Sequence, residues 1–236
     1  MHCSFSPHQR VLFLLGSLVA VALFCGLSYV YWDVPLTRAV RTADPGVHEA
    51  FQLITRFGVS TGYLVASFLG FLLFRFFKRS EVWARGFLFV FASIALSGIT
   101  VDLFKFIFGR FRPQMLNQGL YGFTFFQTDH PLTSFPSGHA ATITALALSV
   151  SLLHRNMPLR VAAVPAVALV VASRVIIGAH YLSDVFFGSY VAAVTTLCLW
   201  RSFSRSGWAD SVLFQPFPRS SVGSAAEGRE CKGGEK

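Results

Sequence analysis

Long apolar stretches alternate with short polar intervals along most of this chain. About 20 apolar residues in a helix cross the hydrocarbon core of a bilayer. Six apolar stretches have this length or approach it: residues 11–32, 60–77, 83–108, 138–153, 159–177 and 181–200. The first lacks a small-residue cleavage site, so it reads as an uncleaved helix. The pattern predicts an all-α fold, a polytopic membrane helix bundle with six transmembrane helices.

Two of the polar intervals carry apolar residues of their own. In residues 33–57, Pro45 and Gly46 open a segment with apolar residues near helical spacing. This predicts a short amphipathic helix on the membrane surface or, alternatively, a lip beside a site. Residues 109–135 are long for a connection and rich in aromatic residues. Such loops are usually functional, so we expect either a lid or an interfacial loop with aromatic anchors.

Composition supports a membrane protein with one domain. The chain of 236 residues is 53% hydrophobic, contains 26 Phe and has a mean hydropathy of +0.56. A soluble domain of this size is much less apolar. We expect a membrane domain over residues 1–205 and a largely disordered cytoplasmic tail over residues 206–236, where Ser, Gly and charged residues dominate. Neither a second domain nor a zinc or disulfide spacing of cysteines is visible.

The basic residues predict the orientation of the bundle. Most of the 20 Lys and Arg residues fall at the N-terminus, after the second and fourth apolar stretches, and in the tail. These segments share one side in a six-span topology, and the positive-inside rule makes that side cytoplasmic. In a bacterial cell the chain would lie in the inner membrane with both termini cytoplasmic. The net charge of +9 then reflects topology and anionic lipid headgroups, and we expect no nucleic-acid partner.

Three polar islands interrupt the apolar pattern, all on the opposite, outward side. They are residues 105–113 (KFIFGRFRP), 134–139 (SFPSGH) and 173–184 (SRVIIGAHYLSD). The islands supply three cations, Lys105, Arg112 and Arg174, and two histidines that can move a proton or attack. A phosphoryl group can be transferred without a metal when cations and amides hold the phosphate oxygens, with a nucleophile on one side and an acid on the other.

Local spacing adds detail to this inventory. Asp184 follows His180 by four residues, so a helix would place both on one face, where the carboxylate can accept from the ring nitrogen not used in chemistry. Ser137 is a natural helix cap before Gly138 and His139. A phosphate should therefore meet free amides at a helix N-terminus, and Gly138 lets the backbone approach it closely.

The three islands resemble the three motifs of the phosphatidic acid phosphatase type 2 superfamily. Lys105 with Arg112-Pro113 matches the first motif, Pro136-Ser137-Gly138-His139 the second, and Ser173-Arg174 with His180 and Asp184 the third. The resemblance implies that His180 is the nucleophile forming a phosphohistidine, with Asp184 beside it, and that His139 is the acid. It implies a phosphate cradle of Lys105, Arg112, Ser137, Gly138 and Arg174. Gln114 and Leu182 depart from familiar patterns at positions without a chemical role.

The function that this resemblance implies is a lipid phosphatase that acts at the outward face of the cytoplasmic membrane and uses neither a metal nor a cofactor. Its substrate would be a terminal phosphate of lipid A, phosphatidylglycerophosphate or phosphatidate; undecaprenyl diphosphate is the alternative. The cations could instead be flanking residues that snorkel to the interface. A protein that binds or transports lipid phosphates without cleaving them is a competing class, although the paired histidines and Asp184 argue against it. Among enzymes the other reading is a haloperoxidase, because the same cradle can hold vanadate, but six membrane spans argue against it. The oligomeric state is open.

Overall fold

The computed structural model describes residues 7–42, 44–154 and 156–205, and in this part of the chain every regular element is a helix. The predicted tail, residues 206–236, lies outside the described residues. The elements are α1 (Pro7–Tyr31), α2 (Asp33–Arg41), α3 (Pro45–Thr55), η1 (Arg56–Gly58), α4 (Ser60–Leu72), η2 (Leu73–Phe77), α5 (Glu81–Phe108), η3 (Pro113–Gln118), η4 (His130–Leu132), α6 (Gly138–Leu153), α7 (Met157–Ile176) and α8 (Leu182–Arg205).

The all-α membrane bundle predicted from the sequence is confirmed, and the predicted count of six spans is approximate. Among the described residues, five segments are long and apolar enough to cross a membrane: Val11–Tyr31, Pro45–Phe77, Glu81–Phe108, Met157–Ile176 and Leu182–Arg205. Helix α6, the fourth predicted span, is not among these five because it has only 16 residues. At 1.5 Å per residue it is about 24 Å long, one turn short of a typical hydrocarbon core.

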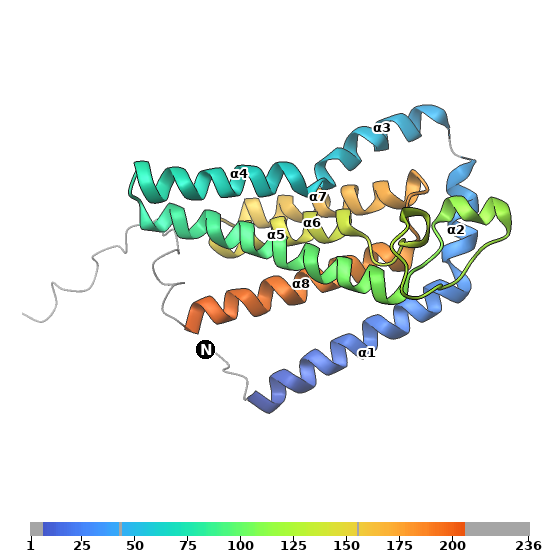
Figure 1. Ribbon diagram of the computed structural model, residues 1–236, viewed down its shortest axis with the longest axis horizontal. Helices are drawn as coiled ribbons and strands as arrows, with labels where there is room; N and C mark the ends of the chain where they lie inside the picture. Colours follow the sequence, from blue (N-terminus) through green and yellow to red (C-terminus); the bar gives the residue numbers. More distant parts are fainter. Residues whose placement is uncertain (1–6, 43, 155, 206–236) are drawn as a thin grey trace, which may run out of the picture.

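Helices α4 to α8 run side by side, whereas α1 packs on α8 from about Ser17 onward and diverges from the bundle toward its N-terminal end (Figure 1). The centre of the bundle is the contact between α5, α6 and α8, where Ile94 and Val101 meet small residues such as Ala141, Ala145 and Ala192. Small side chains let membrane helices approach closely, which favours van der Waals packing in a medium as apolar as the core. Large apolar side chains of α1, such as Phe13 and Leu23, remain exposed and would face lipid.

The interval between the first two spans differs from the expectation. Helix α2 was not predicted, because its sequence reads as a polar stretch with Pro35 inside. Helix α3 forms where the amphipathic helix was predicted, and Asp44 caps it by accepting from the amide of Gly46 at 2.7 Å. It packs on α7 and continues through η1 into α4. Residues 45–77 are thus one nearly continuous helical segment.

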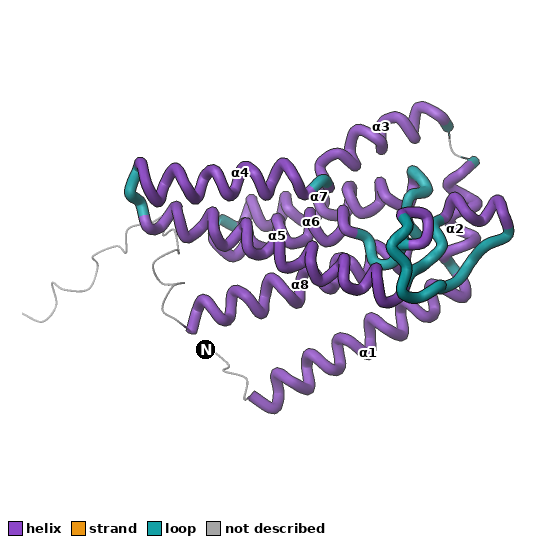
Figure 2. Tube along the Cα trace, viewed as in Figure 1, coloured by secondary structure: helices purple, strands orange, loops and turns teal. Residues whose placement is uncertain are grey.

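Loops gather at one end of the bundle, where α2, α3 and residues 109–135 cover the helix ends (Figure 2). Arg41 of α2 attaches that loop by donating to Asn117 Oδ1 at 2.5 Å and to the carbonyl of Pro113. The three polar islands lie at this same end, because α5 ends there, α6 begins there, and α7 turns there into α8. The fold therefore brings the predicted site residues to one place.

Candidate active site

The starts of α6 and α8 are joined at the level of the backbone. The amide of Ser137 donates to the carbonyl oxygen of Asp184 at 3.0 Å. Gly188, one turn further along α8, lies so close that a Cβ there would be 2.4 Å from the carbonyl oxygen of Ser137. A side chain at position 188 would therefore separate the two helices. This contact fixes the second motif against the third.

His180 lies in the tight turn between α7 and α8, where Gly178 adopts a φ of +66° that a residue with a side chain rarely adopts. Its Nδ1 is 2.8 Å from the carbonyl oxygen of Ser134. A carbonyl can only accept, so Nδ1 carries the proton and Nε2 keeps its lone pair. Nε2 in turn lies 3.5 Å from Nη1 of Arg112. The free electron pair thus points toward a cation.

Asp184 supports His180 less directly than its spacing suggests. Its Oδ2 is 3.6 Å from Nδ1 of His180, beyond hydrogen-bonding distance, so the predicted direct acceptance from the ring is corrected to proximity. The same oxygen accepts from Ser134 Oγ at 2.5 Å and from the amide of Tyr181 at 3.0 Å. Burial lowers the pKa of His180 to about 4, although the neighbouring Asp184 opposes the shift. His180 is therefore neutral at physiological pH.

Arg112 is held by backbone carbonyls. Its Nε donates to the carbonyl of His130 at 2.8 Å and its Nη1 to that of Ala179 at 3.2 Å. The side chain is buried, and burial lowers its pKa from the ordinary value, while Asp184 raises it. An arginine remains protonated even so. Arg112 is thus a rigid cation in front of Nε2 of His180.

Arg174 and Lys105 lie at the ends of α7 and α5. Arg174 donates from Nη1 to Thr55 Oγ1 at 2.7 Å, while its buried Nε has no partner among the described residues. A buried guanidinium nitrogen without an acceptor is unfavourable unless an anion fills the site. Lys105 pairs with Asp102 at 2.9 Å, and its Nζ would be 3.5 Å from a Cβ on Gly138. Gly138 therefore leaves room for a ligand beside Lys105.

The second motif forms the helix start that was predicted. Helix α6 begins at Gly138, and Ser137 caps it by accepting from the amide of Ala140 at 3.5 Å. The first amides of a helix have no intrahelical acceptor, so those of Gly138 and His139 can bind an anion. The ring of His139 packs against Gly58, where a Cβ would come within 2.8 Å of it. The structure thus places all eight predicted residues at one end of the bundle.

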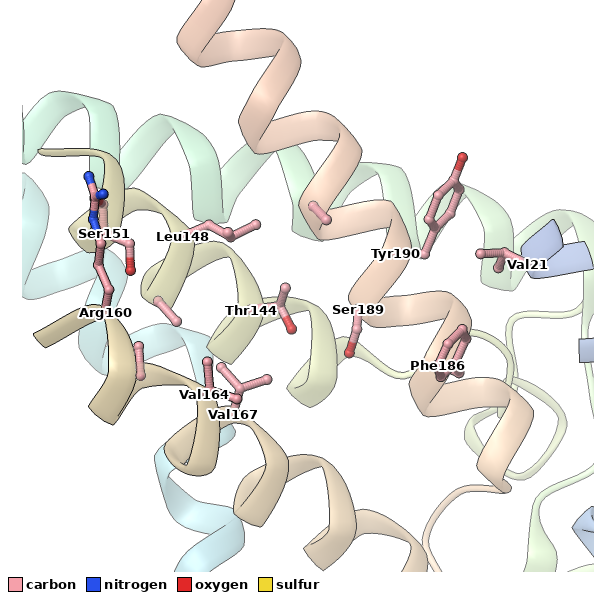
Figure 3. A pocket seen from close by; sticks show the side chains of 13 residues that line it. Val21, Thr144, Leu148, Ser151, Arg160, Val164, Val167, Phe186, Ser189 and Tyr190 are labelled. Carbon is pink, nitrogen blue, oxygen red and sulfur yellow. The ribbon is translucent and has the colours of Figure 1, made fainter. Parts of the chain in front are cut away.

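A groove of about 460 Å³ runs from this end along α4, α5 and α6. Lys105, Gly138 and His139 line it at the site, and apolar residues such as Leu64 and Ile94 line it further along. Asp102, which the sequence analysis did not single out, also lines it. A second groove of about 470 Å³ lies between α1, α6, α7 and α8, next to Thr144, Arg160 and Tyr190 (Figure 3). None of the predicted site residues lines this second groove.

The sequence analysis missed two charged residues behind the site. Arg110 was counted as an ordinary outward basic residue, yet it is completely buried and donates to Asp184 Oδ1 at 2.5 Å and to Asp33 Oδ2 at 2.7 Å. Asp33 was read as the first residue of the polar interval 33–57 and is also completely buried. The position of Arg110 two residues before Arg112 was a signal for the first. For Asp33 the sequence offered none, because its partners are distant in the chain.

Comparisons with known proteins agree with this geometry. A family model described as the PAP2 superfamily matches residues 86–208. The chain is 30% identical over 186 residues to a lipid A 1-phosphatase of Rhizobium etli, covering 72% of this chain and 78% of that protein. It is also 30% identical over 148 residues to a lipid A 4′-phosphatase of Porphyromonas gingivalis, covering 59% and 61%.

Two solved structures share the fold. One is LpxE of Aquifex aeolicus, with a TM-score of 0.52 and 21% identity over 72% of this chain and 94% of that chain. The other is a transmembrane PAP2 type phosphatidylglycerolphosphate phosphatase from Bacillus subtilis, with a TM-score of 0.53 and 19% identity over 80% and 96%. At this identity the likeness concerns the arrangement of the helices.

Proposed function

The chain belongs to the PAP2 superfamily and is a membrane lipid phosphatase, and from this premise we propose that its substrate is a lipid A phosphate. The names of the relatives that it matches over most of its length support this choice, with the 1-phosphate as the first candidate. Phosphatidylglycerophosphate, phosphatidate and undecaprenyl diphosphate are the other substrates to compare. The residues of the site bear on the chemistry of phosphate transfer, which all of these share.

The observation that carries the proposed chemistry, a phosphoryl transfer to His180, is the tautomer of this residue. Because Nδ1–H is bonded to the carbonyl of Ser134, Nε2 can attack phosphorus. The new N–P bond forms as the bond from phosphorus to the lipid oxygen breaks, and His139, which must be protonated while the phosphate is bound, donates the proton that this oxygen takes up. Water then attacks the phosphohistidine, with His139 accepting the water proton, and inorganic phosphate leaves with His180 restored.

The cradle for the phosphoryl group consists of the cationic and amide groups beside His180 and the start of α6. They are Nε of Arg174, Nη1 of Arg112, Nζ of Lys105 and the amides at the start of α6. Because charge spreads over the phosphoryl oxygens in the transition state, preorganised cations stabilise it. Ser137 contributes by capping α6, and its hydroxyl hydrogen remains able to donate.

Metal independence is part of the proposal. Divalent metals in phosphatases take several carboxylate or histidine ligands. Within residues 7–42, 44–154 and 156–205, no three such side chains gather as a metal site would require. The three cations of the cradle occupy the role that metal ions have in other phosphatases. A nucleophilic histidine with cationic neighbours needs no activated water in the first step.

The groove beside His139 supports a lipid as substrate. It extends from the site along α4 and α5 between helices that are apolar enough to span the membrane. A lipid whose phosphate is bound at Lys105 would therefore have its acyl chains beside Leu64 and Ile94, inside the bilayer. We further propose that this end faces the periplasm from the inner membrane, with both termini cytoplasmic, as the basic residues indicate. Residues 109–135 would then form the wall next to the lipid headgroup.

The test is release of inorganic phosphate by the purified protein in detergent. The four lipids would be compared at equal concentration, with His180→Ala as the inactive control and EDTA in a parallel reaction. We expect lipid A to give the highest kcat/KM and EDTA to have no effect. Preference for another lipid would reject lipid A as the substrate. Loss of activity in EDTA that magnesium restores would reject the metal-free mechanism. Binding without phosphate release would favour a lipid-binding protein.

A further inference from the structure

Arg110 and Asp33 form a buried ion-pair network directly behind the catalytic carboxylate. Nη1 of Arg110 donates to Asp184 Oδ1 at 2.5 Å and to Ser183 Oγ at 2.7 Å. Nη2 donates to Asp33 Oδ2 at 2.7 Å. Both side chains of the Arg110–Asp33 pair are at most 1% exposed. Both residues are completely buried, and Arg110 contacts the carboxylate of Asp184 rather than His180, so neither is placed to touch the substrate.

Asp33 is itself held on several sides. Its Oδ1 accepts from Ser28 Oγ at 2.7 Å and from the amide of Ser183 at 3.1 Å, and its Oδ2 accepts from Ser183 Oγ. It lies where α1 ends and α2 begins, outside the residues 86–208 that match the family model. The network therefore connects the N-terminal helices to the first turn of α8.

Aromatic rings exclude water from this network. The guanidinium carbon of Arg110 lies between 4.3 and 5.5 Å from the centroids of four rings, those of Tyr29, Tyr121, Phe123 and Tyr181. The hydroxyl of Tyr121 accepts from Nη2 at 3.1 Å and donates to the carbonyl of Tyr29 at 2.7 Å. In such a dry environment charges interact strongly, and breaking one pair leaves an uncompensated buried charge.

We propose that Arg110 and Asp33 are positioning residues that orient Asp184 and, through it, His180 for attack. This inference rests on the proposed function of His180 as the nucleophile. Oδ1 of Asp184 is fixed by Arg110, so Oδ2 is aimed at Ser134 Oγ and lies 3.6 Å from Nδ1 of His180. The cluster of two carboxylates and one guanidinium carries a net charge of −1. It favours the positive charge that the imidazole gains when the N–P bond forms.

The charges of the cluster give two variants with opposite effects. The charged and titratable groups around His180 are Arg112, Arg174, His139 and Asp184. Arg110→Gln removes a positive charge from their surroundings, which stabilises imidazolium and moves the acid limb of kcat/KM to higher pH. Asp33→Asn removes a negative charge and moves the acid limb to lower pH. If a substitution acted only by disturbing the fold, the shift of the acid limb would not follow the sign of the charge that was removed.

The rates should follow the same logic, with KM nearly unchanged because neither residue reaches the substrate. Breaking a buried pair is strongly unfavourable, so we expect kcat to fall about 10²-fold in Arg110→Gln and about 5-fold in Asp33→Asn. The double variant restores the cluster's net charge of −1 and should be about 10-fold faster than Arg110→Gln alone. Arg110→Lys keeps the charge and should keep the acid limb while lowering kcat.

The experiment measures kcat and KM against pH for wild type and these four variants, on whichever lipid phosphate the wild type hydrolyses. Active protein is counted after size-exclusion chromatography in detergent, so a folding defect is separated from a catalytic one. If the acid limbs of Arg110→Gln and Asp33→Asn fall at the same pH, or if the variants differ from wild type only in KM, the positioning role is wrong. Absence of turnover in the wild type would instead reject the phosphatase function itself.

Discussion

The carbonyl oxygen of Ser134 lies 2.8 Å from Nδ1 of His180, closer than the carboxylate of Asp184 at 3.6 Å. A backbone carbonyl cannot be removed by substitution of its own side chain, and it holds the imidazole in one tautomer. A residue of the second polar island therefore orients His180, the proposed nucleophile, in the third island. Asp184 contributes charge and holds Ser134 Oγ in place.

This relationship predicts a moderate effect of Asp184→Asn. In a triad whose carboxylate is the acceptor of the ring N–H, the amide costs about 10⁴-fold, because it favours the wrong tautomer. Here Ser134 keeps the tautomer, so we expect a loss in kcat of about 10²- to 10³-fold. Steady-state kinetics on a lipid phosphate measures it. A loss as large as that of His180→Ala would show that the carboxylate, not the carbonyl, sets the tautomer.

The two histidines should differ in their dependence on the leaving group. His180→Ala should abolish turnover of every substrate, because no other group receives the phosphoryl. His139→Ala should cost about 10²- to 10⁴-fold on a lipid phosphate, the usual contribution of a general acid. It should cost much less on p-nitrophenyl phosphate, whose departing oxygen hardly needs a proton. If His139→Ala lost equal activity on both substrates, or if the aryl ester rescued His180→Ala, the two roles would be wrongly assigned.

The lowered pKa of His180 predicts activity in mild acid. The nucleophile must be neutral, so kcat/KM falls only as the pH drops through the pKa of about 4 that burial produces. An ordinary histidine, with a pKa of about 6.5, would already be mostly protonated at pH 5. We expect at least half of the maximal kcat/KM to remain at pH 5. An acid limb near pH 6.5, measured on p-nitrophenyl phosphate, would contradict a neutral buried His180.

Gly58 provides a steric test of His139. A Cβ at this position would come within 2.8 Å of the Cβ and ring atoms of His139, so Gly58→Ala must displace the ring. Geometric misplacement of a catalytic group by about 1 Å can cost 10²-fold, and we expect a loss of about that size on a lipid phosphate. Gly62→Ala in α4 is the matched control, because nothing lies within 4 Å of its Cβ. Equal activities of the two variants would place His139 outside the reaction.

The proposed orientation predicts which segments a reporter finds in the cytoplasm. A reporter fused after Lys78, between η2 and α5, should be cytoplasmic, and so should one after Trp200. A reporter inserted at Gln118 should be periplasmic, since this exposed residue belongs to the loop at the site end. The basic residues near Lys78 motivate the assignment. The reverse pattern would move the site to the cytoplasmic leaflet.

The sequence predicted the parts of the molecule whose signals are local. Periodicity and apolar length indicate the spans, and Ser137 before Gly138 predicts the start of α6. The motif residues meet because each lies at a helix end on the same side. Arg110 and Asp33 could not be found this way, since a buried arginine and a snorkelling one look alike in sequence. Their pairing depends on α1 crossing beside α8, which is a property of packing.

The direct acceptor of the His180 ring was missed for a similar reason. Spacing of four residues indicates that Asp184 can face His180, but it carries no information about a carbonyl from another segment. The carbonyl of Ser134 is placed by the loop, where the amide of Ser134 donates to the carbonyl of Arg110 at 3.0 Å. Helix α2 escaped prediction because its stability comes from Asp33 and Arg41 contacts made elsewhere in the chain.

The contact of Gly188 with the backbone of Ser137 limits how this enzyme can diversify. Since α6 and α8 touch without an intervening side chain, the proposed phosphate-binding turn and the proposed nucleophile cannot move apart to suit a larger headgroup. Accommodation of new lipids must come from α4, α5 and residues 109–135, which line the other side of the site. Substrate choice can thus change by mutation of those surfaces while the chemistry stays constant.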